Sequence, residues 1–167
     1  MTFTLALFAA ACGNNASATE PPTLPPTVTG TPDPCAPENI QAEVQKTHDY
    51  MREFDDASNL AAHIPVDQLP DAIANLQRIR REAEDQPTPP CLIDLKTYKI
   101  SHMNVVINTL INLIGFANGT VDQQVIDQGI AVAREQHDKY ALELARLLGV
   151  TPVPATVVFP PTQTPGP

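Results

Sequence analysis

The sequence predicts an all-α protein, an antiparallel up-down-up-down four-helix bundle with disordered Pro/Thr-rich tails. Three observations favour this fold class. Apolar residues recur at helical spacing in four stretches, and no stretch alternates with a period of two, the pattern of a strand. The 18 prolines divide evenly, with six each in residues 1–35, 36–149 and 150–167. The middle stretch is the expected bundle, and its six prolines all lie where a predicted helix begins or ends, since proline disrupts a helix interior.

A proline-containing break separates the first two predicted helices. Pro37 begins the first helix, because a proline at the first helical position loses no needed donor, and this helix ends near His63. Asp67 caps the second helix, which ends at the proline-rich segment 86–90. Breaks this short between long helices favour antiparallel neighbours. The apolar stripes of the two helices consist of Ile40, Val44, Met51, Phe54, Leu69, Ile73, Leu76 and Ala83.

The third and fourth helices are also predicted from apolar spacing and from residues typical of helix ends. The third runs from Cys91 to about Asn118 and is closed by Gly119. Its C-terminal half is largely apolar, so we expect it to be the most buried helix. The fourth begins at residues 120–123, which have the pattern of a capping box, and ends at Gly149. Its apolar stripe consists of Ile126, Ile130, Ala133, Tyr140, Leu144 and Leu148.

Charge and motifs exclude several classes of function. The stretch 36–149 carries 17 acidic and 10 basic side chains, a net charge of −7, and has no basic stripe. We therefore expect no nucleic-acid partner, since phosphate neutralisation needs clustered Lys and Arg. The sequence has no P-loop, no dinucleotide-binding glycine motif and no Gly-x-Ser-x-Gly turn. No carboxylate pair stands out for glycosidase-like chemistry. The protein is therefore expected not to be an enzyme.

The N-terminal residues point to export. Residues 3–11 form a short apolar run that ends in small residues directly before Cys12. Such a run is typical of a signal peptide, here residues 1–11, and is too short to span a bilayer. The arrangement resembles the lipobox of bacterial lipoproteins. The resemblance implies that Cys12 carries a lipid, which anchors the protein extracytoplasmically in the membrane of the cell envelope or at the cell surface. Residues 12–35 would then form an extended Pro/Thr-rich tether.

The two remaining cysteines are expected to form a disulfide. In an up-down-up-down bundle the first and third helices begin at the same end, and Cys35 and Cys91 lie at those two starts. Disulfides persist in exported chains. A bond between residues 56 positions apart would stabilise the fold by about 4 kcal/mol in the chain-entropy model.

Three histidines suggest an alternative function, a metal- or haem-binding bundle. Counted from the Cys35/Cys91 end at 1.5 Å per residue, His48, His102 and His137 all lie about 16 Å up the bundle. Converging imidazoles could bind a transition metal or haem. In angular terms His137 falls at the centre of its apolar face, whereas His48 and His102 fall to the side. Without this site, no cofactor is expected.

Four charged residues are candidates for an ion network. Arg80 and Lys99 fall on the apolar sides of their predicted helices, and Glu43 and Glu143 lie at a similar height. Unpaired charges in the bundle interior would be costly, so either mutual ion pairs or a ligand carboxylate would offset them. The other interpretation is that these side chains extend to water from the end of the bundle.

The expected function is a non-enzymatic binding or structural module, whose partner is an envelope protein or a small ligand. The second predicted helix is shorter than its neighbours. The end of the bundle farthest from Cys91 is therefore expected to hold a crevice near Leu60, Ile114 and Val125. The connection 63–67 would remove this crevice if it folded over the gap.

Overall fold

The computed structural model describes residues 31–151, and these residues form four helices. No residue of this range lies in a strand, so the prediction of an all-α four-helix protein is confirmed. The predicted signal peptide, the lipid-bearing Cys12, nearly all of the tether and nearly all of the C-terminal tail lie outside the described residues. The elements are α1 (Pro37–Ala61), η1 (Val66–Gln68), α2 (Leu69–Asp85), η2 (Pro90–Leu92), α3 (Ile93–Ala117) and α4 (Gln123–Leu147).

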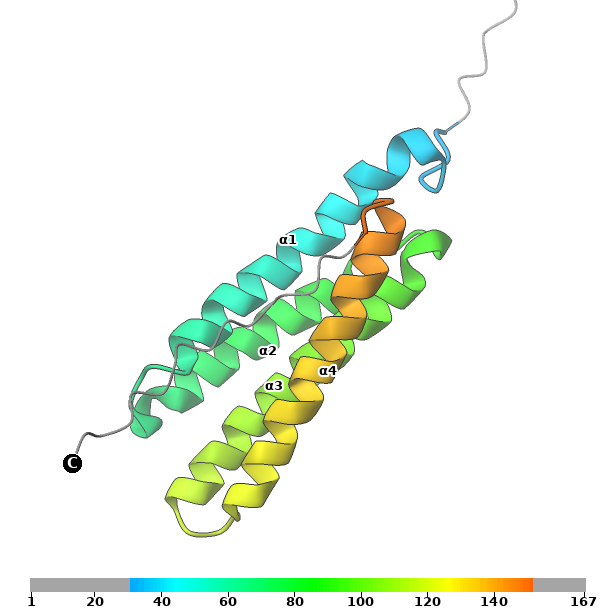
Figure 1. The fold of residues 1–167 in the computed structure, drawn as a ribbon. Coiled ribbons are helices and arrows are strands. Elements are labelled where there is room, and N and C mark those ends of the chain that lie inside the picture. Colours follow the sequence, from blue (N-terminus) through cyan, green and yellow to red (C-terminus); the bar gives the residue numbers. More distant parts are fainter. Residues whose placement is uncertain (1–30, 152–167) are drawn as a thin grey trace, which may run out of the picture. The chain divides into compact units, whose positions relative to one another are not determined.

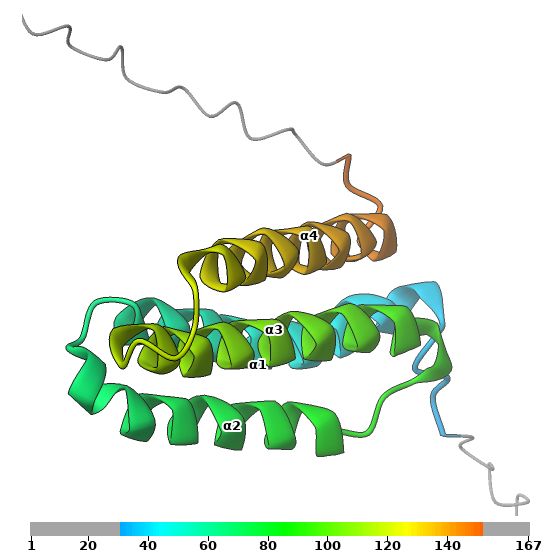
Figure 2. The same cartoon turned by 90° about the horizontal axis from the view of Figure 1, so that it is seen from below.

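Successive helices run in alternating directions (Figure 1). The chain passes along α1, returns along α2, passes along α3 and returns along α4. The four helices do not contribute equally to one central core. Figure 2 shows α4 lying over α3, on the side away from α2, and α4 packs chiefly on α3. The protein is thus a three-helix core with a fourth helix laid on its outer face.

The main hydrophobic core lies among α1, α2 and α3. Phe54 of α1, Leu76 of α2 and Leu95 of α3 are fully buried. Within the described residues, Tyr140 is the member that α4 contributes to this buried cluster. The 3₁₀ turn before α3 adds Leu92, which closes the core at the end that carries the cysteines.

The helix boundaries differ from the predicted ones by a few residues. Helix α1 ends at Ala61, two residues before His63. Asp67 does not cap α2, because it lies within the 3₁₀ turn η1, and α2 begins at Leu69. Cys91 likewise lies in the 3₁₀ turn η2 rather than in α3. Pro65 precedes η1 and Pro90 begins η2, and single 3₁₀ turns are common at the N-termini of α-helices.

The predicted capping box at residues 120–123 is not formed. Asp122 occupies the N-cap position of α4 and makes no side-chain cap hydrogen bond. The Thr120 hydroxyl instead donates to the carbonyl of Gly115 at 3.0 Å. This bond closes α3, together with Gly119, which has a φ of +72°. The threonine therefore serves the end of the preceding helix rather than the start of the next.

The predicted disulfide between Cys35 and Cys91 is present, with a Cα–Cα distance of 5.8 Å. It joins the segment before α1 to the segment before α3. The Cys91 amide also donates to the Cys35 sulfur at 3.4 Å. The bond therefore holds the starts of these two helices together, as the bundle topology predicted.

By length and composition alone, one described stretch, Pro90–Ala117, could cross a membrane, with a mean hydropathy of 1.4. This stretch is α3 with its preceding turn. Its Lys99 ammonium bonds to the carbonyl of Thr47 in α1, and its His102 ring contacts the carbonyl of Ala133 in α4. These polar contacts join α3 to α1 and to α4.

Candidate functional site

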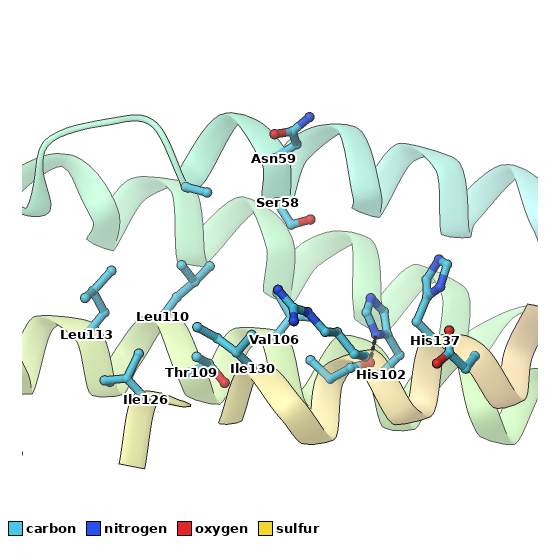
Figure 3. A pocket seen from close by; sticks show the side chains of 14 residues that line it. Ser58, Asn59, His102, Val106, Thr109, Leu110, Leu113, Ile126, Ile130 and His137 are labelled. Atoms are coloured by element: carbon cyan, nitrogen blue, oxygen red, sulfur yellow. Dashed lines mark hydrogen bonds between the residues drawn. The ribbon is translucent and has the colours of Figure 1, made fainter. Parts of the chain in front are cut away.

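A groove of about 460 Å³ opens between α1, α3 and α4 (Figure 3). Its floor is apolar and comes from α3 and α4. Leu113 and Ile126 lie at one end, and His102 and His137 lie at the other. The volume is within the range of small-molecule sites. The lining consists of Ser58, Asn59, Ala62, His102, Val106, Thr109, Leu110, Leu113, Ile126, Ile130, Ala133, Arg134, His137 and Asp138.

The groove exists because α1 does not cover the apolar side chains beneath it. At this level α1 presents Ser58, Asn59 and Ala62, which are small or polar. They lie opposite the larger aliphatic side chains of Leu110 and Ile130. Since α2 packs on the other side of α3, no helix of the described chain fills the space.

A close approach of α3 and α4 holds the floor in place. A Cβ atom added at Gly129 of α4 would clash with the Thr109 side chain of α3. Glycine at this position therefore leaves room for the Thr109 side chain. The Thr109 hydroxyl is held in turn by a 2.8 Å hydrogen bond to the carbonyl of Val105. The position of α4 on α3 is therefore set by a specific contact rather than by general apolar packing.

At the histidine end of the groove two lining residues, His102 and His137, lie close to Asp55, which does not itself line the groove. We call these three side chains the Asp55 cluster. Asp55 Oδ1 lies 3.6 Å from His102 Nε2, and Asp55 Oδ2 lies 3.9 Å from His137 Nε2. The two imidazole rings meet edge to face, with centroids 5.3 Å apart. Three helices thus place one carboxylate and two rings around a small space at the end of an apolar channel.

The hydrogen bond of His102 decides which of its ring nitrogens is free. Nδ1 lies 2.9 Å from the carbonyl oxygen of Ala133. A carbonyl only accepts, so Nδ1 carries the proton. In the neutral ring Nε2 then holds a lone pair, and this lone pair faces a carboxylate oxygen of Asp55. Two acceptors face each other across a distance too long for a hydrogen bond.

His48 lies apart from the Asp55 cluster. Its Nδ1 lies 2.9 Å from the hydroxyl oxygen of Tyr140, and the two rings are stacked. Burial lowers the pKa of His48 and raises the pKa of the Tyr140 hydroxyl. Both shifts favour a neutral pair in which the hydroxyl donates to the ring nitrogen. The structure therefore brings together two of the three histidines predicted for a metal site and uses the third elsewhere.

No group of three or more His, Cys, Asp or Glu side chains within residues 31–151 is arranged to hold a metal ion. The His48 contact with Tyr140 explains why the predicted set does not converge. The metal or haem site therefore stays a prediction.

Lys99 is fully buried and bonds to neutral groups. Its ammonium donates to the carbonyl of Thr47 at 3.2 Å and to the side-chain oxygen of Gln86 at 3.4 Å. It also lies 5.5 Å from the centre of the Tyr50 ring, a cation–π contact. Burial, with the nearby Lys96 charge, lowers the pKa of Lys99 to about 8.

The predicted ion network of Glu43, Arg80, Lys99 and Glu143 is not formed. Glu43 pairs with Lys46, Arg80 with Glu84, and Glu143 with Arg146, each within its own helix. Partners three or four residues away on one helix are already neighbours, so these pairs need no contact between helices. Within residues 31–151 Lys99 has no carboxylate partner, and its ammonium bonds to the two oxygens described above.

The groove begins near the predicted crevice, with Asn59, Leu113 and Ile126 in its lining, and extends further along α3. Leu60, Ile114 and Val125 are absent from its lining, and Leu60 is 68% exposed. The groove is nearer the middle of α3. Two functional residues were missed from the sequence. Asp55 lies seven residues after His48 on α1, a helical spacing that was a usable signal, whereas Arg134 carries no local signal.

Comparison of the chain with protein-family models, curated proteins and solved structures finds no match.

Proposed function

We propose that this protein is a lipid-anchored, extracytoplasmic binding module without enzymatic activity, and that its groove binds an elongated apolar small molecule. The observation that carries this proposal is the apolar channel between α1, α3 and α4, which has two histidines at one end and a few further polar residues along its edge. Ligand sites typically combine an apolar lining with a few placed polar groups. The linear order of the lining residues favours a ligand of one extended chain.

The shape of the groove favours a small molecule over a second copy of the protein. Protein interfaces need roughly 800 Å² of good complementarity on each partner. Here the apolar surface is a concave channel, and its neighbours Asn59, Arg134 and Asp138 are polar. An apolar channel with a polar rim can enclose a small apolar ligand, whereas the flat surface of a second protein copy would not fill the channel.

Fluorescence of N-phenyl-1-naphthylamine tests the groove, since this neutral dye emits strongly in apolar surroundings. We expect the purified domain to bind it with one site. Ile130→Arg should weaken binding at least tenfold, because the arginine would place a charge in the channel. Ile130 is 41% exposed, so this substitution leaves the core intact.

Ile111→Arg is the matched control, because Ile111 is 45% exposed on α3 and does not line the groove. It should leave dye binding unchanged. Absence of binding, or equal loss in the two variants, would contradict the proposed ligand site. Native mass spectrometry also reports any second copy that binds instead.

The location is supported by the disulfide, which is typical of oxidising compartments, and by the lipobox-like residues before Cys12. Replacing Cys12 with Ser should move the protein from the membrane fraction to the soluble fraction of its host. Unchanged partitioning would contradict the lipid anchor but not the groove.

A further inference from the structure

The Asp55 carboxylate receives no hydrogen bond from another group of residues 31–151, since the two histidine nitrogens that face it are too far away. His102 donates from Nδ1 to the carbonyl of Ala133, and in the neutral ring its Nε2 carries a lone pair. It faces Asp55 Oδ1 at 3.6 Å, and His137 Nε2 faces the other carboxylate oxygen at 3.9 Å. His102 is only 7% exposed, whereas the side chains of Asp55 and His137 are 41% and 46% exposed and reach water. A ligand group that donates hydrogen bonds could replace water on the Asp55 oxygens.

The charges nearby favour a cation. The groove lining holds one carboxylate, Asp138, and one guanidinium, Arg134, and these two offset each other. Asp55 then decides the sign of the charge at this end. Asp55 is the one carboxylate of the cluster. A carboxylate ligand would add a second one and would donate no hydrogen bond.

We propose that the groove binds a single-chain amphiphile with a primary ammonium head, which rests on the ligand-binding function proposed above. The alkyl chain lies along the apolar floor toward Leu113 and Ile126, and the ammonium donates to Asp55 and to His102 Nε2. An ammonium has three donors and no acceptor, which matches the cluster. A hydroxyl head has one donor and no charge, so it satisfies only part of the site.

Three ligands with the same tail test this inference: dodecylamine, dodecanol and dodecanoate, each used below micelle formation to displace the naphthylamine dye at pH 8. At this pH the amine is charged, as a lysine ammonium is, and the carboxylate is ionised. We expect the amine to displace the dye at concentrations at least tenfold lower than the carboxylate, with the alcohol between them.

Asp55→Asn should remove the preference for the amine and leave displacement by dodecanol unchanged. Asp56→Asn is the matched control, since Asp56 is the next residue on α1, is exposed and makes no contact with either histidine. Asp56→Asn removes one negative charge, as Asp55→Asn does. A loss of amine binding that both variants share therefore comes from the net charge of the protein and not from a local contact. Equal loss in both variants would overturn the inference.

Other outcomes separate the two proposals. If the dye does not bind at all, the groove is not a ligand site. If the dye binds but the three heads bind equally, or the carboxylate binds best, the ammonium site is wrong and the apolar site stands.

Nitrogen NMR of the ligand-free protein at pH 8 gives a further test, since a protonated His102 Nε2 would pair with Asp55 directly and overturn the inference. Binding of Zn²⁺ alone that is lost in Asp55→Asn would overturn it in favour of a metal.

Discussion

His48 Nδ1 lies 2.9 Å from the hydroxyl oxygen of Tyr140, and this contact joins α1 to α4. Elsewhere α4 packs chiefly on α3, and Tyr140 is its contribution to the main buried cluster of the described residues. The pair is therefore a principal connection between the fourth helix and the first half of the bundle.

Tyr140→Phe should lower the free energy of unfolding by about 1–2 kcal/mol, because it removes a partly buried hydrogen bond and leaves the ring nitrogen of His48 without its donor. Urea denaturation measures the change. Tyr98→Phe is the control, since the Tyr98 hydroxyl makes no hydrogen bond within residues 31–151, and it should leave stability nearly unchanged. Equal effects would contradict this role of the pair.

Acidification should destabilise the protein through His48. Burial lowers the pKa of His48 below its usual value of 6.5 in the folded state. The unfolded chain then binds more protons, so the contribution of His48 to stability is fully present above about pH 6.5 and falls as the pH drops below it. In His48→Asn the amide oxygen can accept from Tyr140 without titrating. The urea midpoint of this variant should fall less between pH 7.5 and 5 than that of the unmodified protein, and parallel curves would contradict the assignment.

Lys99 should make the protein more stable as the pH rises from 8 toward 10. Its pKa is about 8 in the folded state, against 10.5 ordinarily. In this window the unfolded chain holds the proton that the folded chain releases, so stability rises by about 2 kcal/mol. Above pH 10 the raised pKa of Tyr140 acts in the opposite direction. Lys99→Met should lack the rise in a urea series, and the same slope in both proteins would contradict it.

Gly129→Ala should destabilise the protein, although alanine is the better helix former by about 1 kcal/mol. The added methyl group would clash with Thr109 and push α4 away from α3. Thr109→Ala removes the obstructing atoms, so the double variant should recover most of the loss. Thermal unfolding of the four proteins in a double-mutant cycle measures this coupling. Additive effects would mean that the two residues do not set the helix spacing.

Reduction of the disulfide should cost about 4 kcal/mol, because the bond closes a loop of 56 residues in the unfolded chain. Urea unfolding with and without reductant measures the difference. The double variant Cys35→Ser, Cys91→Ser should match the reduced protein and be insensitive to reductant. Two alkylatable thiols in the native domain would contradict the bond.

The helices and the disulfide could be predicted because their causes are local or topological. Prolines mark the breaks, apolar spacing marks the faces, and Cys35 and Cys91 lie at two helix starts that an alternating topology brings together. The capping box was wrong because its threonine had two competing partners, and the carbonyl of Gly115 prevailed. Sequence patterns do not rank such alternatives.

The site could be predicted only in part, because it depends on how α4 is placed. His102 and His137 were expected at one height, and they do meet. Their partner Asp55 depends on the rotation of α1 toward α4, which the apolar stripe alone does not define closely. The groove depends on side-chain size at Ser58 and Ala62 opposite Leu110. Whether the side chains of three helices fill the space between them depends on how the helices pack, and the sequence pattern of one helix does not give this.

The bond between Cys35 and Cys91 also governs how the domain responds to a mechanical pull from its N-terminal side. Tension that enters the chain before Cys35 passes through the sulfur atoms to the start of α3 before it reaches α1. Helix α1 cannot then be unwound from its first turn by force alone, and the load passes to α3, which packs on α2 and α4. In a chain held by its N-terminal segment, α1 and α2 lie inside the disulfide loop and would stay outside the path of the load until the bond is reduced.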